Sequence, residues 1–144
     1  MLISSIVSEK GQDVVTIDPD RTISDALQLL REHNFGALVV SSDGNRIDGI
    51  ISERDVVRRL CDDPGTLDRS VRELMTSSVI TCTPDDVVTS VMSQMTEHHF
   101  RHMPVVDKEG TLSGIISIGD VVKWRLNELE EQWTKLQEYM ASGR

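Results

Sequence analysis

Hydrophobic and polar positions follow the same order twice along the chain. Short β-rich runs that stop at a proline come first, and each is followed by a stretch with apolar residues at helical spacing. Two apolar runs separated by a turn-rich segment come next, and a second helical stretch closes each copy. The pattern predicts strands at 14–17, 37–40 and 47–51 with helices at 22–35 and 52–60, then strands at 79–82, 103–106 and 112–116 with helices at 87–96 and from 117.

The two copies are related by an offset of 65 residues without gaps. Residues 14–60 and 79–125 are identical at fifteen of 47 aligned positions, whereas chance would give about three. A single copy would be too small to bury a stable core, so two copies that share one fold are expected. The sequence therefore predicts an α+β protein built from a duplicated β-α-β-β-α unit.

Segments outside the repeat complete the predicted organisation. A turn-rich linker follows the first copy, and residues 3–10 and 70–75 are typical of short lead-in helices. We expect a first motif with its lead-in helix at 1–66, a second motif at 67–126 and a C-terminal amphipathic helix at 127–144.

The C-terminal segment carries an apolar seam at heptad spacing. The spacing 4-3-4-3-4 is typical of a helix that packs along one side against another helix. The seam either folds back on its own domain or pairs with a second subunit, and we expect the second, a homodimer. The seam residues are Val122, Leu126, Leu129, Trp133, Leu136 and Met140.

Charge and composition narrow the classes of function. A net charge of −9 makes nucleic acid an improbable partner, since such proteins need a basic face. No apolar run is long enough for a membrane span, and no secretory signal is expected. Cys61 and Cys82 form no disulfide framework, which favours a cytoplasmic location.

A Ser-x-x-Asp pattern stands at the same place in both copies, directly after a Gly-Ile-Ile strand. Ser52 with Asp55, and Ser117 with Asp120, would lie at the N-terminus of a helix. Such a pair is a capping box on one interpretation. On the other, the helix N-terminus receives a phosphate and the carboxylate accepts hydrogen bonds from ribose hydroxyls. The two roles are compatible.

These motifs, in this order and in duplicate, resemble the CBS domain family over residues 3–126. The resemblance implies two motifs packed sheet to sheet about a pseudo-twofold axis, with adenosine ligands in two symmetry-related clefts. The segments that carry it are 15–19, 36–40 and 49–55 in the first copy and 80–84, 101–107 and 114–120 in the second.

The resemblance also implies that each cleft combines residues of both motifs. In cleft A, the Ser-x-x-Asp of the first motif faces the second motif, and in cleft B the relation is reversed. Cleft A would contain Ser52, Arg54, Asp55, Val79, Ile80, Phe100, Arg101 and His102. Cleft B would contain Ser117, Asp120, Val14, Val15, Phe35, Gly36 and Ala37.

The two clefts are not equivalent in charge. Arg54, Arg101 and His102 of cleft A correspond to Gly119, Gly36 and Ala37 of cleft B. We expect cleft A to hold phosphates more tightly and cleft B to be roomier and less basic.

The resemblance implies a non-catalytic sensor or regulatory module that binds AMP, ADP or ATP and acts on a regulated partner protein. One alternative is a redox sensor that binds NAD(H), and another is a structural dimerisation module without a ligand. No nucleophile and base, dinucleotide fingerprint or P-loop is present, so an enzyme is not expected. The clustered histidines lack convergent carboxylate or thiolate ligands, so neither a metal site nor a catalytic cofactor is expected.

Overall fold

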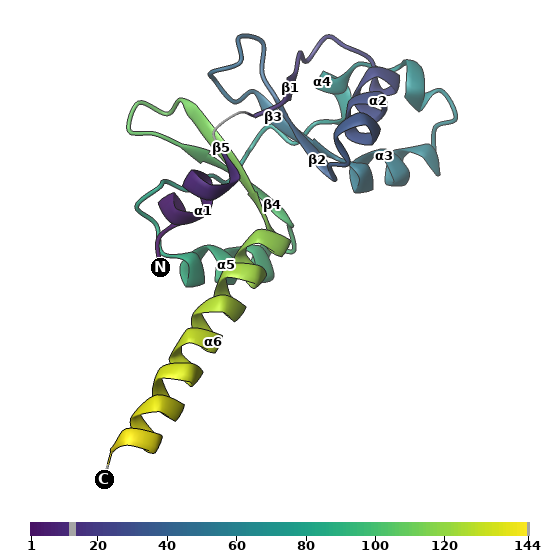
Figure 1. Cartoon of the computed structure of the whole chain (residues 1–144). Coiled ribbons are helices and arrows are strands. Elements are labelled where there is room, and N and C mark those ends of the chain that lie inside the picture. The colour runs from purple at the N-terminus through teal and green to yellow at the C-terminus, as the bar shows by residue number, and fades with distance from the viewer. Residues whose placement is uncertain (12–13, 144) are drawn as a thin grey trace.

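The computed structural model describes residues 1–11 and 14–143, and its two repeats form two α/β units that lie side by side (Figure 1). The mixed α+β fold and its duplication are as predicted. The helices are α1 (Ile3–Lys10), α2 (Ile23–His33), α3 (Glu53–Leu60), α4 (Val71–Leu74), α5 (Val88–His98) and α6 (Ile118–Ser142), with a 3-10 turn at Thr66–Asp68. The strands are β1 (Thr16–Ile17), β2 (Ala37–Val40), β3 (Gly49–Ser52), β4 (His102–Val106) and β5 (Leu112–Ser117).

The first motif contains a three-stranded sheet. β2 lies in the middle, parallel to β1 and antiparallel to β3. All four residues of β2 are buried, as expected for a central strand with both faces covered. α2 packs its apolar face on this sheet and ends where Asn34 adopts a left-handed conformation (φ 56°), two residues before the predicted end.

The second motif has a smaller sheet than predicted. β4 and β5 pair in antiparallel fashion, but the strand predicted at 79–82 contributes only one parallel bridge, between Cys82 and Val105. Pro104 occupies the position that Val39 has in the first motif, and proline has no N–H to donate to a neighbouring strand. The ladder therefore stops at Cys82.

The two lead-in helices are crossed between the motifs. α1 precedes the first motif along the chain, yet Ile3 and Ile6 are buried in the core of the second motif. α4 precedes the second motif, and Val71 is buried in the core of the first. Each motif therefore completes its core with the lead-in helix that precedes the other motif along the chain. As a result, neither folded unit is one continuous segment of the sequence.

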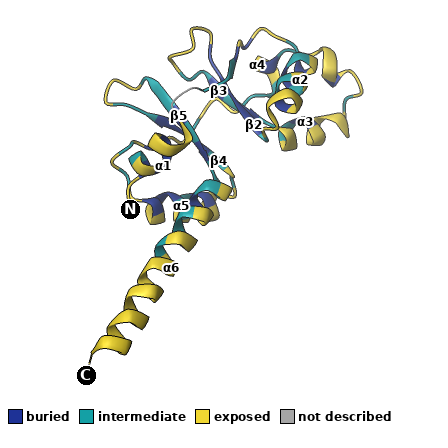
Figure 2. Cartoon of the chain, in the orientation of Figure 1, coloured by how far each residue is buried: buried dark blue, intermediate teal, exposed yellow. Residues whose placement is uncertain are grey.

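α6 combines two elements that the sequence pattern predicts as separate helices. The second helix of the second motif continues without a break into the predicted C-terminal helix and extends away from both motifs (Figure 1). Its outer part is exposed (Figure 2), and the seam residues Leu126 and Trp133 are 55% and 60% exposed. The fold-back alternative is therefore wrong for this structure.

Candidate functional site

A cavity of about 350 Å³ lies between the two motifs. It is bordered by the N-terminal turn of α3, by β3, by the segment that enters the second motif, and by the loop before β4. Every residue predicted for cleft A lines it. The lining residues are Gly36, Ala37, Ile50, Ser52, Glu53, Arg54, Asp55, Arg58, Thr76, Ser78, Val79, Ile80, His99, Phe100, Arg101 and His102.

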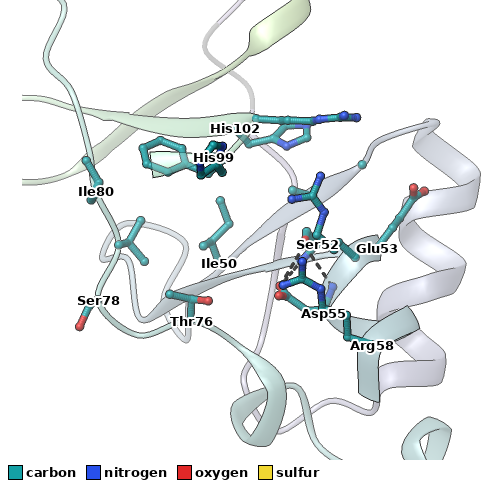
Figure 3. Close-up of a pocket in the computed structure, with 16 residues that line it drawn as sticks. Ile50, Ser52, Glu53, Asp55, Arg58, Thr76, Ser78, Ile80, His99 and His102 are labelled. Carbon is teal, nitrogen blue, oxygen red and sulfur yellow. Dashed lines mark hydrogen bonds between the residues drawn. The ribbon is translucent and has the colours of Figure 1, made fainter. Parts of the chain in front are cut away.

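The N-terminus of α3 is closed by a complete capping box at the cavity wall (Figure 3). The Asp55 N–H donates to Ser52 Oγ (3.3 Å), and the Ser52 N–H donates to Asp55 Oδ2 (2.9 Å). The Ser52 hydroxyl donates to the same Oδ2 at 3.0 Å. Asp55 Oδ1 makes no hydrogen bond within the described residues, so this oxygen can accept from a ligand hydroxyl.

Three arginines reach the cavity. Arg54 and Arg58 lie one helical turn apart on α3, and Arg101 comes from the opposite motif. None of the three forms an ion pair within the described part of the chain. Because the protein as a whole is acidic, this local excess of positive charge favours an anionic ligand.

Apolar groups form the other side of the cavity. Ile80 is 41% exposed although it is a large aliphatic residue, and it faces the cavity together with Ile50 (Figure 3). Phe100 stacks on His98 with ring centroids 5.9 Å apart. A planar apolar ring could be held here, while Ser52, Asp55 and Arg58 lie on the other side of the same space.

His102 lies where the central loops of the two motifs meet. A Cβ at Gly36 would be 3.2 Å from its Cε1, so the imidazole packs directly against the glycine backbone. Burial lowers the pKa of His102 below its usual value, and the positive charges of Lys10 and Arg101 lower it further, while Asp120 opposes them. The imidazole is therefore neutral near pH 7.

Cleft B has the same capping geometry but a different environment. The Asp120 N–H donates to Ser117 Oγ (3.2 Å), and the Ser117 N–H donates to Asp120 Oδ2 (2.9 Å). The Lys10 ammonium donates to this Oδ2 at 2.7 Å. Burial alone would raise the pKa of Asp120, but the bonds from Lys10 and Ser117 outweigh it, and the pKa lies below its usual value.

Two of the remaining residues assigned to cleft B, Gly36 and Ala37, also line the cavity of cleft A. Phe35 is 38% exposed and stacks on His33, with ring centroids 5.3 Å apart. Val14 is half-buried, and Val15 packs against the core of the first motif.

Sequence reasoning missed several groups at both clefts. Arg58 could have been found, because it follows Arg54 by four residues and so shares its face of α3. Thr76 reaches cleft A through a backbone bridge to Ile50, for which the sequence holds no signal. Lys10 was missed because it lies outside the 47 repeated positions.

Within residues 1–11 and 14–143, no three His, Cys, Asp or Glu side chains gather in a way that could hold a metal ion. Among the helices of these residues, none has both the length and the apolar character to cross a membrane.

Comparison with known proteins identifies the fold. The family model of the CBS domain matches residues 3–62 and 71–127. A crystal structure of a CBS-domain-containing protein from Agrobacterium tumefaciens is 41% identical and superposes with a TM-score of 0.82, over 87% of this chain and 99% of that one.

Two further relatives cover most of the chain. The mitochondrial CBS domain-containing protein CBSX3 of Arabidopsis thaliana is 34% identical over 150 residues, 98% of this chain and 72% of that protein. The crystal structure of CBSX2 in complex with AMP is 29% identical with a TM-score of 0.68, over 81% of this chain and 90% of that one. With a match to the family in each of its two repeats, the chain belongs to the CBS domain family as a CBS-domain pair.

Proposed function

We propose that this CBS pair is a non-catalytic regulatory module that binds an adenine nucleotide, AMP, ADP or ATP, in cleft A. The observation that carries the proposal is the gathering of three arginines, none ion-paired within the described residues, with a capped helix N-terminus in one cavity. The AMP complex of the related CBSX2 supports the same class of ligand.

The chemistry of the cavity matches the three parts of such a ligand. Ile50, Val79 and Ile80 offer apolar contacts to adenine. Asp55 Oδ1 would accept hydrogen bonds from the ribose hydroxyls, since an ionised carboxylate is an acceptor only. The phosphates would lie toward the α3 N-terminus and the arginines, where both the helix dipole and the guanidinium groups favour negative charge.

Titration calorimetry with adenosine, AMP, ADP and ATP tests this assignment. Asp55→Asn keeps the size of the side chain and is expected to weaken all four ligands by roughly tenfold to a hundredfold, the effect of losing a hydrogen bond to a charged group. Arg101→Ala is expected to weaken the phosphorylated ligands and to leave adenosine nearly unchanged. Arg31→Ala, an exposed α2 arginine outside the cavity, is the matched control. Equal losses for adenosine and ATP in Arg101→Ala would contradict the proposed phosphate contact.

NAD(H) is a weaker candidate than a mononucleotide. Room for a dinucleotide would come from the small residues Gly36, Ala37 and Gly119. His102 packs against Gly36, and Ala37 is only 4% exposed, so part of that room is filled. The same titration with NAD(H) separates the two ligands, and binding of neither would favour the structural module.

We further propose that the chain forms a homodimer through α6. The exposed seam needs an apolar partner, and a second copy supplies one with the same heptad spacing. In a parallel pair, Arg125 of one chain would face Glu130 of the other, so the flanking charges are complementary. Ligand binding between the motifs would change their relative orientation and so act on a regulated partner protein. The cytoplasmic location stays a prediction.

A further inference from the structure

The second cleft is not vacant in this chain, because a lysine occupies its carboxylate. The Lys10 ammonium lies 2.7 Å from Asp120 Oδ2 and 3.0 Å from the carbonyl oxygen of Ile115. In the pseudo-symmetric position of cleft A, the counterpart Asp55 has no cation bonded to it within the described residues, and Ile50 pairs with the backbone of Thr76. The two clefts therefore differ by an ion pair as well as by their arginines.

Lys10 is held in place by the fold rather than by its own side chain alone. It is the last residue of α1, and Ile3, Ile6 and Val7 anchor that helix in the core of the second motif. A lysine in the last turn also interacts favourably with the negative end of the helix dipole. Neither partner of the ion pair is fully exposed, since the Lys10 and Asp120 side chains are 39% and 27% exposed.

The ammonium competes directly with a ribose. A ribose hydroxyl binds a carboxylate by donating a hydrogen bond to it, and Lys10 already donates to Asp120 with a full positive charge. A ribose that relies on the full charge of this carboxylate binds only where the ion pair is open, so its apparent affinity falls by the fraction of open molecules. Ser117 donates its N–H to the same oxygen, and Asp120 Oδ1, like Asp55 Oδ1, makes no hydrogen bond within the described residues, so the clefts differ by the ammonium and the charge that it neutralises.

We infer that Lys10 closes cleft B, so that one chain binds one adenine nucleotide, and that this residue determines the stoichiometry of the pair. The inference rests on the proposed function of the clefts. Lys10 precedes the repeated segment, so the comparison of the two copies does not reveal this role.

The number of AMP molecules bound per chain, measured by equilibrium dialysis, tests the inference. Wild type is expected to bind one, and Lys10→Ala to bind two, because the Asp120 carboxylate becomes available. Lys10→Arg keeps the cation and is expected to bind one. Lys108→Ala removes the same charge from an exposed loop and is the matched control, also at one.

Variants that prevent binding in cleft A distinguish the closure of cleft B from the proposed function of cleft A. At an AMP concentration only just high enough to fill cleft A of the wild type, Asp55→Asn is expected to leave cleft A largely empty, and Lys10→Ala with Asp55→Asn to bind about one AMP, in cleft B. Because Asp55 also caps α3, Ile80→Trp provides a second block that fills the cavity and leaves the cap intact. Circular dichroism verifies that every variant is folded.

The results test two statements, that Lys10 closes cleft B and that cleft A binds the nucleotide. Two AMP molecules bound by wild type, or a Lys10→Ala variant that still binds only in cleft A, would overturn the closure by Lys10 and leave the function of cleft A standing. A wild type that binds none, together with a Lys10→Ala variant that binds one despite either block, would overturn cleft A and support the closure. No binding by any variant would overturn both.

Discussion

At the scale of single residues, the duplicated positions carry different chemistry. His102 corresponds to Ala37, and Arg101 corresponds to Gly36, so one motif contributes large polar side chains where the other contributes almost none. The difference has a steric reason. A Cβ at Gly36 would be 3.2 Å from the imidazole, so the ring would have to shift slightly to admit even a small side chain there. The asymmetry therefore lets the loop before β2 and the start of β4 approach each other closely.

Because of His102, we expect the free energy of unfolding to decrease as the pH falls below about 7. Its pKa is lowered in the folded protein, so the unfolded chain binds the proton more readily below the ordinary pKa of 6.5. Stability should consequently be full above that value and fall as the pH drops through the lowered pKa. The slope for one proton cannot exceed about 1.4 kcal/mol per pH unit.

Urea unfolding of wild type and His102→Gln at several pH values measures this contribution. The variant should lose less stability than wild type between pH 7.5 and pH 5, because glutamine does not take up a proton. Asp120 does not interfere in this window, since its pKa lies below the usual 3.8. Parallel profiles for the two proteins would exclude the imidazole as the cause.

At the scale of elements, α6 is the feature that the isolated chain leaves without a partner. It is 25 residues long, and only Val121 in it is buried. Most stability of a helix in a protein comes from packing of its apolar face rather than from propensity. An exposed seam with Leu129, Leu136 and Tyr139 on a protruding helix therefore favours association.

Disruption of the seam is expected to dissociate the dimer. Leu129→Glu with Leu136→Glu places two charges at core positions of the heptad, where neither has a partner. Light scattering should then report about 16.1 kDa rather than twice that mass. Asn127→Glu with Thr134→Glu adds the same charge on another face of α6 and should stay dimeric. A monomeric wild type, or a dimer that survives the seam variant, would show that α6 is not the interface.

At the scale of the whole molecule, the crossed lead-in helices tie the two motifs together. The Ile3 N–H donates to the carbonyl oxygen of Asp86 (2.9 Å), and the Val71 N–H donates to that of Arg21 (2.8 Å). Each motif thus obtains part of its core and of its hydrogen bonding from a distant segment. Neither half of the chain holds all the residues of one core.

Core truncations should reveal this crossing. Ile3→Ala is expected to cost about 2–5 kcal/mol, as for other buried isoleucines, and to loosen the second motif first. Hydrogen exchange should accelerate at α5 and β4 amides before those of α2. Val71→Ala, a buried residue of the other lead-in, is the matched control and should accelerate exchange in α2. Faster exchange in α2 than in α5 after Ile3→Ala would contradict the crossed arrangement.

The sequence by itself determined the features that arise from local pattern. Apolar spacing predicted nearly every element, and the offset of 65 predicted the duplication. The resemblance to the CBS family grouped the eight residues of cleft A, and all eight line one cavity. The heptad spacing likewise marked the seam of α6. These features could be predicted because secondary structure and repeats are recorded in the periodicity of neighbouring residues.

Only the tertiary structure decided the contacts between distant segments. It placed α1 on the second motif, Lys10 on Asp120 and His102 against Gly36, and it joined the last helix to the second motif. The pattern of one segment shows that it has an apolar face, but the surface that covers the face depends on how the whole chain packs. The two clefts therefore differ also by Lys10, which lies outside the repeat and reaches only one of them through the packing of α1 on the second motif.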